Sequence, residues 1–207
     1  RMVLTARPRV AFAVPQVLQA GRSQRVTLYG RRLPGGHPST VLGADGEPLE
    51  QRDLEITAPA EASVPSATVE ALGRPSASSL AHESWLWRGS EGLSPTQPVL
   101  FGLTPLSVIA GASTGLVSVA PPCEFSSLFP ARGQWSGVTF EAKKGQVFWV
   151  ELGSERWGHP VDPMAVVQRA KTPEAALEGA GWVDVLELAD TEQNLGDREF
   201  PTAHRDA

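Results

Sequence analysis

Short apolar runs that alternate with polar residues recur along this chain, and the alternation predicts β-strands. Val26 and Leu28 would share one face of an extended segment, because successive side chains of a strand point to opposite faces. Thr27 between them would point to the other face. Leu54 and Ile56 repeat the pattern further along the chain. Helical apolar spacing is not sustained over about a dozen residues anywhere, so the chain is predicted to be all-β.

Glycine and proline, with 20 and 18 residues, divide the chain into short segments of the length expected for strands. The expected strands are residues 9–13, 24–30, 52–57, 67–71, 84–88, 99–103, 106–110, 115–120, 124–129, 135–140, 146–152, 164–169 and 182–188. Asp45-Gly46 predicts a hairpin with a type I′ turn, whose central residues both need positive φ. Thr172 is a candidate cap for one short helix over residues 173–178.

Two changes of composition predict the domain organisation. Residues 58–79 are rich in Ala, Ser and Pro and indicate an extended loop around one weak strand. The small-residue stretch Gly111 to Gly115, GASTG, indicates a hinge. We therefore expect two β-sandwich domains, residues 1–112 and 113–207, with the second incomplete at its C-terminus.

Charge and cysteine content exclude several classes of protein. The net charge of −5 comes from interspersed signs, so no basic stripe exists to neutralise the phosphates of a nucleic acid. No apolar run reaches the roughly 20 residues that span a bilayer. Cys123 is the single cysteine, which excludes an internal disulfide and a cysteine-based zinc site. We interpret this thiol as a small buried hydrophobe rather than a nucleophile.

The segment Val17 to Gly36 reads VLQAGRSQRVTLYGRRLPGG, a glycine-led loop followed by a strand of alternating pattern and then Gly30 and Leu33. Over these residues the chain resembles the opening of IPT/TIG domains, the immunoglobulin-like sandwiches that are repeated on cell-surface proteins. The resemblance implies an immunoglobulin-like β-sandwich for the first domain.

A longer resemblance covers residues 117–207. The run PCEFSSLFPARGQWSGVTFEAKKGQVFWVEL, followed by SERWGHPVDPMAVVQ, is similar to the bacterial pre-peptidase C-terminal (PPC) domain of planctomycete secreted proteins. The resemblance implies a jelly-roll-like sandwich in an exported, multidomain protein, with an extracytoplasmic location and neighbouring domains as partners. Members of this family are accessory modules rather than catalysts. Residues 133–137 lack the aspartate-bearing turn of many PPC domains, which counts against a calcium site on that turn.

A hydrolase is the alternative from a different functional class. The stretch GASTG satisfies the G-x-S-x-G pattern of a nucleophile elbow, with Ser113 as the nucleophile. The elbow requires a helix directly after the serine, whereas residues 116–119 predict a strand. No two of the four histidines have the spacing of a metal-ligating pair, and we expect no catalytic residue.

The loop over residues 155–163 concentrates polar groups. Arg156 can fork onto Asp162 and brace the loop as an ion pair, which is the interpretation that we favour. A calcium ion held by Asp162, Glu155 and backbone carbonyls is the alternative, because hard cations accept mixed oxygen ligands. Apart from this calcium ion, no cofactor is expected.

Six tryptophans against one tyrosine suggest a surface on which sugar rings could stack. Trp85 and Trp87 would share one face of their strand, where we favour a role in the core, and Trp157 lies in the polar loop. Trp135 and Trp149 occupy expected strand positions, at which burial is the default. The candidate ligand surface is therefore Trp85, Trp87, Glu155, Arg156, Trp157 and Asp162.

These patterns together predict a non-catalytic accessory module of a larger exported protein. It would act in interdomain scaffolding, adhesion or substrate binding, with an extracellular protein or a polysaccharide as partner. The alternatives are a carbohydrate-binding module that uses exposed tryptophans and a part of a serine hydrolase.

Overall fold

The chain folds as an all-β protein, which confirms the fold class expected from the sequence. The computed structural model describes residues 6–43, 45–61, 83–89, 93, 98–110, 115–129, 133–154, 159, 163–172, 175 and 181–188. Its strands are β1 (Arg9–Val14), β2 (Val17–Gln19), β3 (Ser23–Arg31), β4 (His37–Leu42), β5 (Pro48–Thr57), β6 (Glu83–Trp87), β7 (Val99–Thr104), β8 (Ser107–Ala110), β9 (Gly115–Ser118), β10 (Cys123–Ser126), β11 (Ser136–Thr139), β12 (Ala165–Ala170) and β13 (Trp182–Leu188). Within these residues, no helical segment has the length and apolar character that a bilayer span requires.

The strands fall into two compact units. The described residues up to Glu141 form unit 1, which contains β1 to β11, and those from Ala142 onward form unit 2, which contains β12 and β13. The domain boundary expected between residues 112 and 113 stays a prediction. The expected strand over residues 67–71 lies outside the described residues.

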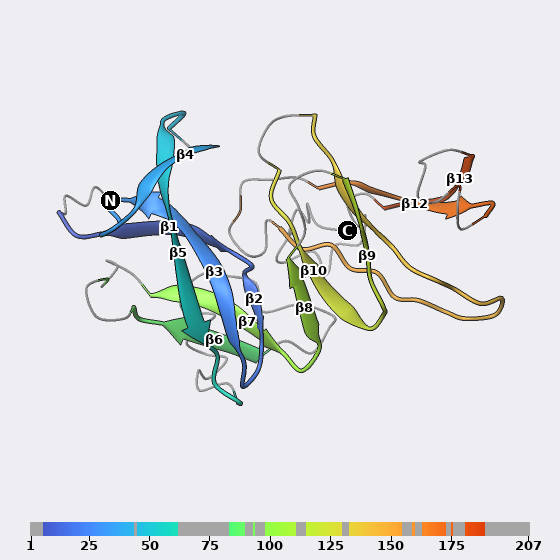
Figure 1. The fold of residues 1–207 in the computed structure, drawn as a ribbon, viewed down its shortest axis with the longest axis horizontal. Helices are drawn as coiled ribbons and strands as arrows, with labels where there is room; N and C mark the ends of the chain where they lie inside the picture. The colour runs from blue at the N-terminus through green and yellow to red at the C-terminus, as the bar shows by residue number, and fades with distance from the viewer. Residues whose placement is uncertain are drawn as a thin grey trace, which may run out of the picture. The chain divides into compact units, whose positions relative to one another are not determined.

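Unit 1 contains a four-stranded sheet in the order β1-β3-β5-β4 and a three-stranded sheet in the order β2-β7-β6 (Figure 1). In the larger sheet, β3 lies antiparallel to both of its neighbours, with Val26 opposite Leu54 and Thr27 opposite Asp53. In the smaller sheet, β7 pairs in parallel with β2 and antiparallel with β6. Two parallel pairs, β8 with β10 and β9 with β11, complete the described strands of this unit.

Side chains from both sheets share one hydrophobic core. Val26 and Leu28 of β3 are fully buried in it, as the alternating pattern predicts, and Phe101 of β7 is fully buried with them. The remaining members of the cluster are Ala13, Leu18, Leu33, Ile56, Ala58, Trp87, Leu93, Val99 and Leu103. Burial of these apolar side chains removes them from water and is the main stabilising contribution to this unit.

Buried Gln16 links the two sheets through polar contacts. Its side-chain oxygen accepts a hydrogen bond from the backbone nitrogen of Ala13 on β1, at 3.3 Å, and its amide nitrogen donates to the carbonyl of Leu100 on β7. A buried amide that finds both partners avoids the cost of desolvating an unpaired polar group. Gln16 therefore fixes the relative position of β1 and β7 at the edge of the core.

The hairpin expected at Asp45-Gly46 is present, since β4 and β5 pair on either side of this loop, but its turn type differs from the prediction. Of the two residues only Gly46 has a positive φ, of 79°, so a type I′ turn is wrong. The Gly46 nitrogen donates to the Gly43 carbonyl at 2.9 Å, and the Gly43 nitrogen donates to the Glu47 carbonyl at 2.8 Å. These bonds close a longer loop with glycine at its left-handed position, which is a common alternative to the two-residue turn.

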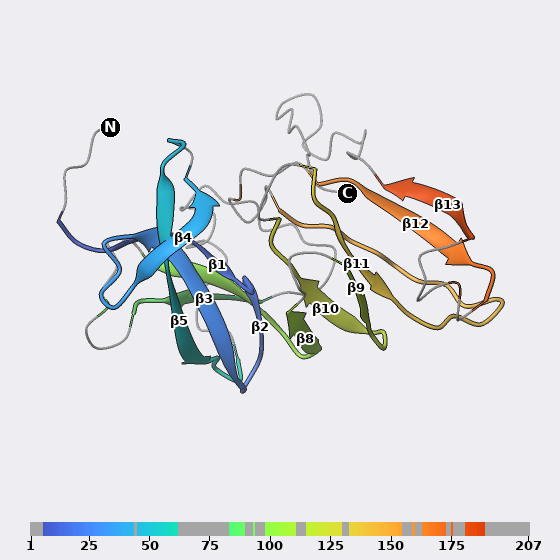
Figure 2. The same cartoon turned by 45° about the horizontal axis from the view of Figure 1, so that its top comes forward.

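Unit 2 contains the antiparallel pair β12 and β13 (Figure 2). Gln168 donates to the Asp184 carboxylate across this pair, at 2.7 Å. Thr172 caps a helical position as the sequence predicts, because its hydroxyl accepts a hydrogen bond from the nitrogen of Ala175 at 3.2 Å. The other residues of the expected helix lie outside the described ranges. The strand expected over residues 146–152 is wrong, since these residues belong to no strand.

Candidate functional site

The candidate ligand residues Trp85 and Trp87 lie on β6, beside the core of unit 1. Trp87 is 8% exposed and belongs to the core cluster, which agrees with the core interpretation of this residue. Trp85 is partly buried and packs against the same cluster, with its ring 6.0 Å from that of Phe101. Both rings are thus engaged in packing at the core, which disfavours a role as a platform for sugar rings.

The other four candidate ligand residues lie outside the described ranges. They are Glu155, Arg156, Trp157 and Asp162. The ion pair that would brace their loop, and the calcium ion that is its alternative, therefore stay predictions. Ser113 lies outside as well, but β9 begins two residues later, so a strand follows the GASTG stretch where an elbow would need a helix.

The described part of unit 2 has an exposed apolar segment, Gln146–Val150, which we call the arm (Figure 2). The arm follows a tight turn in which the Gln146 nitrogen donates to the Lys143 carbonyl at 3.0 Å. Gly145 takes a positive φ of 88° in this turn, a conformation that glycine adopts without steric cost. Both lysines of this turn, Lys143 and Lys144, are exposed, and residues 146–150 belong to no strand.

Exposure alternates along the arm. Val147 is 94% exposed and Trp149 is 75% exposed, while Phe148 and Val150 between and after them are more covered. This period of two is that of an extended segment whose odd-numbered side chains face solvent. Burial of Trp149, the default expected from the sequence, is therefore wrong. Trp135 of unit 1 is also exposed, at 59%, and precedes β11 rather than lying within it.

Other apolar side chains of unit 2, on β12, on β13 and directly before β12, are exposed as well. Met164, Val166, Val183, Val185 and Leu186 are each more than a third exposed. Among the residues that the structure describes, every hydrophobic side chain that is fully withdrawn from solvent belongs to unit 1. Unit 2 thus presents to solvent the kind of side chains that unit 1 buries. Their exposure makes these side chains candidate binding residues.

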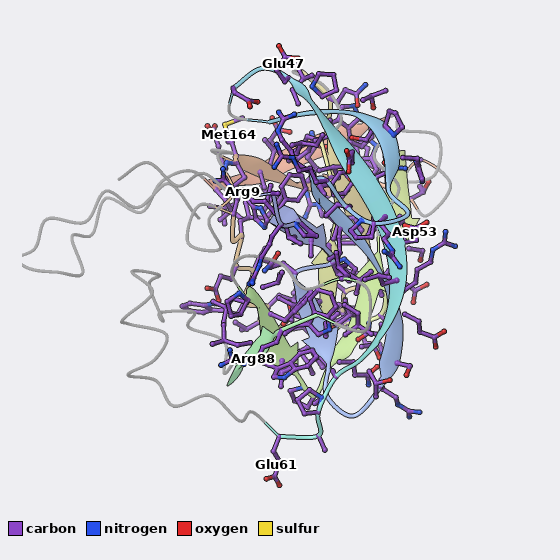
Figure 3. The ribbon with its side chains drawn as sticks, turned by 90° about the vertical axis from the view of Figure 1, so that its left-hand side faces the viewer. Arg9, Glu47, Asp53, Glu61, Arg88 and Met164 are labelled. Atoms are coloured by element: carbon purple, nitrogen blue, oxygen red, sulfur yellow. The ribbon has the colours of Figure 1, made fainter. Side chains whose placement is uncertain are left out.

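Charged side chains on the outer face of the large sheet interact with one another. Asp53 of β5 accepts hydrogen bonds from Thr27 at 2.6 Å and from Arg25 at 2.5 Å, both on β3, and Figure 3 shows the Asp53 side chain at the surface of the sheet. These hydrogen bonds hold the pKa of the Asp53 carboxyl below its ordinary value, because they favour the ionised form, and the bond from Thr27 has the largest effect. The cluster ties β3 to β5 and leaves this carboxylate engaged in structure.

Substituting Asp53 by Asn should make the stability of unit 1 less dependent on pH. A carboxyl whose pKa is depressed in the folded state stabilises the fold above its unfolded pKa of about 4, and this contribution is lost as the pH falls through the folded value. Because the side chain of Arg25 is 79% exposed and that of Asp53 is 37% exposed, solvent screens this pair, and we expect the substitution to cost less than about 1 kcal/mol at neutral pH. The urea midpoints of the two proteins, measured from neutral to acidic pH, should converge in acid.

The matched control for this titration is Glu61→Gln, at an exposed carboxyl beyond the end of β5 (Figure 3). It removes one negative charge from the same unit without touching the cluster, and so measures what the loss of a charge alone does to the midpoint. A constant difference between Asp53→Asn and the unsubstituted protein across the whole range would show that the carboxyl is not linked to folding.

The remaining titratable candidates, Cys123, His37 and His159, lie on different elements of the chain. Cys123 opens β10 and is half-buried, and this burial raises the pKa of its thiol, which disfavours the reactive thiolate. His37 is exposed on β4, and His159 is half-buried in unit 2. Within the described residues, no three His, Cys, Asp or Glu side chains lie close enough together to hold a metal ion.

Comparison with known proteins returned no match: no family model, no curated protein and no solved structure is similar to this chain. Both family resemblances therefore stay hypotheses.

Proposed function

We propose that this chain is a non-catalytic β-sandwich module of a larger exported protein, and that it acts in interdomain scaffolding, adhesion or substrate binding. The first support is the difference between its two units: unit 1 buries apolar side chains in a core, whereas unit 2 exposes such side chains to solvent. In unit 1, both sheets share a closed core, and surface groups such as Asp53 and Arg25 are committed to cross-strand contacts. A rigid scaffold of this kind positions binding groups without itself taking part in chemistry.

The observation that carries the proposal is the exposure of the arm. Val147 and Trp149 project from one side of an extended segment, 94% and 75% exposed. A tryptophan contributes strongly to an interface when a partner covers it, because it combines a large apolar area with few rotatable bonds. We therefore propose that the arm is the binding surface and that its partner is a neighbouring domain of the parent protein, which would cover it.

A carbohydrate-binding role is the second candidate, and one observation favours it. Among the tryptophans that the structure describes, Trp135 and Trp149 are the most exposed, at 59% and 75%. Exposed aromatic rings can stack on sugar rings. In this version of the function, Trp135 of unit 1 or Trp149 of unit 2, each on its own unit, takes the place of Trp85 and Trp87, which pack at the core.

Hydrogen exchange of the arm tests the proposal and separates its two versions. The isolated chain, the full-length parent protein and the isolated chain with soluble polysaccharide are compared. If a neighbouring domain covers the arm, the amides of residues 146–150 should exchange at least about tenfold more slowly in the full-length protein. Protection that appears only with polysaccharide would favour carbohydrate binding, and exchange that is equally fast in all three samples would overturn both versions.

Matched variants show whether protection depends on the exposed side chains. Trp149→Ala removes the largest of them and should abolish the protection without changing the melting temperature of the isolated chain. Leu42→Ala removes a comparably exposed apolar side chain from β4 of unit 1 and should leave the protection intact. Protection that survives Trp149→Ala would assign binding to another surface.

A further inference from the structure

The loop that joins β4 to β5 carries the only Asp-Gly pair of the sequence, Asp45-Gly46. In such a pair, the backbone nitrogen of the glycine can attack the side-chain carboxyl carbon of the aspartate. The nitrogen gives up its proton, a carboxyl oxygen leaves as water, and a five-membered succinimide forms. Water then opens the ring at either carbonyl, which restores aspartate or yields isoaspartate. The sequence of steps loses one water and regains one, so it needs no other reactant.

Both residues of the pair are open to solvent. A methyl group added at Gly46 would meet no atom within 4 Å, so nothing crowds the nucleophilic side of the pair. The Asp45 side chain is 61% exposed, which gives water access to the carboxyl carbon and to the ring that would form there. Steric hindrance therefore does not protect this peptide bond.

Hydrogen bonds to other groups of the loop and to Arg31 engage both reacting groups. Arg31 of β3 donates through Nη2 to the two carboxylate oxygens of Asp45, at 2.7 and 2.9 Å. The Glu47 nitrogen donates to the same carboxylate at 3.2 Å. The Gly46 nitrogen, which would be the nucleophile, donates to the Gly43 carbonyl at 2.9 Å. Reaction therefore requires the loop to open and the carboxylate to leave Arg31, because a productive approach needs the reacting atoms aligned.

We propose that Asp45-Gly46 is a site of isoaspartate formation in this protein and that Arg31 is the positioning residue that restrains it. Arg31 is suited to this role because it also donates to the carbonyls of Pro48, at 3.2 Å, and Glu47, at 3.3 Å. One guanidinium thus holds the carboxylate and the far side of the loop together. Isoaspartate would add one atom to the backbone between β4 and β5 and shift the register of β4, the edge strand of its sheet.

The experiment follows isoaspartate at position 45 during incubation of the folded chain at neutral pH. Peptides are separated by liquid chromatography and identified by electron-transfer fragmentation, which distinguishes the two isomers. Arg31→Gln removes the guanidinium and should raise the rate about two- to fivefold, the range expected for an exposed ion pair. Asp45→Glu should abolish the product, because the corresponding six-membered ring forms far more slowly.

The matched control is Arg25→Gln, which removes the other ion pair of β3 and leaves the loop untouched. Its rate at position 45 should equal that of the unsubstituted chain. An equal rise in both arginine variants would mean that general loosening sets the rate, and an absence of isoaspartate in the unsubstituted chain would remove the site; either result overturns the proposal. If Arg31→Gln fails to fold, Arg31→Lys keeps the charge without the fork and should give a smaller rise in a folded protein; no rise in that variant overturns the role of Arg31.

Discussion

Replacing Phe101 by Ala should lower the free energy of unfolding of unit 1 by about 3–5 kcal/mol. Phe101 lies in the middle of β7, the central strand of its sheet, and no part of its side chain is exposed. The substitution removes the ring and leaves a cavity between the two sheets, where the strands that surround it are paired and cannot easily close the space. Denaturation by urea, followed by circular dichroism, measures the loss as a lower midpoint.

Leu42→Ala is the matched control for this substitution. Leu42 is 60% exposed on β4, so its truncation should change the free energy of unfolding by no more than about 0.5 kcal/mol. If Phe101→Ala and Leu42→Ala had equal effects, Phe101 would not lie in a closed core, and the shared core of the two sheets would be wrong.

The strands that the sequence predicts well are those with one buried face. β3 and β5 lie within a few residues of their expected bounds, because Val26 and Leu28 on β3, and Leu54 and Ile56 on β5, repeat with a period of two and contribute to the core. Here the local pattern and the tertiary environment require the same conformation, so local information is sufficient. Thr172 was equally predictable, since a helix cap depends on residues within one turn.

Elements that depend on distant partners were not predictable in this way. β2 has three residues and no alternation, and it exists because it pairs in parallel with β7, more than eighty residues later in the chain. The turn at Asp45-Gly46 was expected from the dipeptide alone, whereas its type depends on how many residues the flanking ladder leaves in the loop. Pairing across the chain therefore decides both features.

The candidate site shows the same limit. The arm is apolar at consecutive positions, Val147, Phe148, Trp149 and Val150, so its sequence identifies no buried face, and a continuous run of this kind is typical of a strand covered on both sides. Whether a segment is exposed depends on which other residues surround it in the fold, and the sequence of the segment itself does not specify them. For Trp87, in contrast, the sequence favours a position in the core, and the structure confirms it. Trp87 lies on β6, which pairs with β7, and both strands contribute side chains to the core.

Replacing Gly30 by Ala should destabilise unit 1 by about 3 kcal/mol, at the upper end of the range for an added core methyl group. A Cβ built at Gly30 would lie 2.1 Å from the carbonyl oxygen of Arg9 and 3.0 Å from the Cα of Val10. Both are backbone atoms of β1, so no side-chain rotation can relieve the contact. β1 contains a bulge directly after Val10, and the substitution would force this strand away from β3.

Gly137→Ala tests whether the effect belongs to that close approach. Gly137 also lies in a strand, β11, but its nearest neighbour would be the end of the flexible Leu116 side chain, at 3.1 Å. This side chain is 40% exposed and can move, and alanine restricts the unfolded chain more than glycine does. We therefore expect a change within about 0.5 kcal/mol for Gly137→Ala in the same urea titration. Equal midpoints for the two variants would mean that β1 does not approach β3 this closely in solution, because only the Gly30 variant meets immovable backbone.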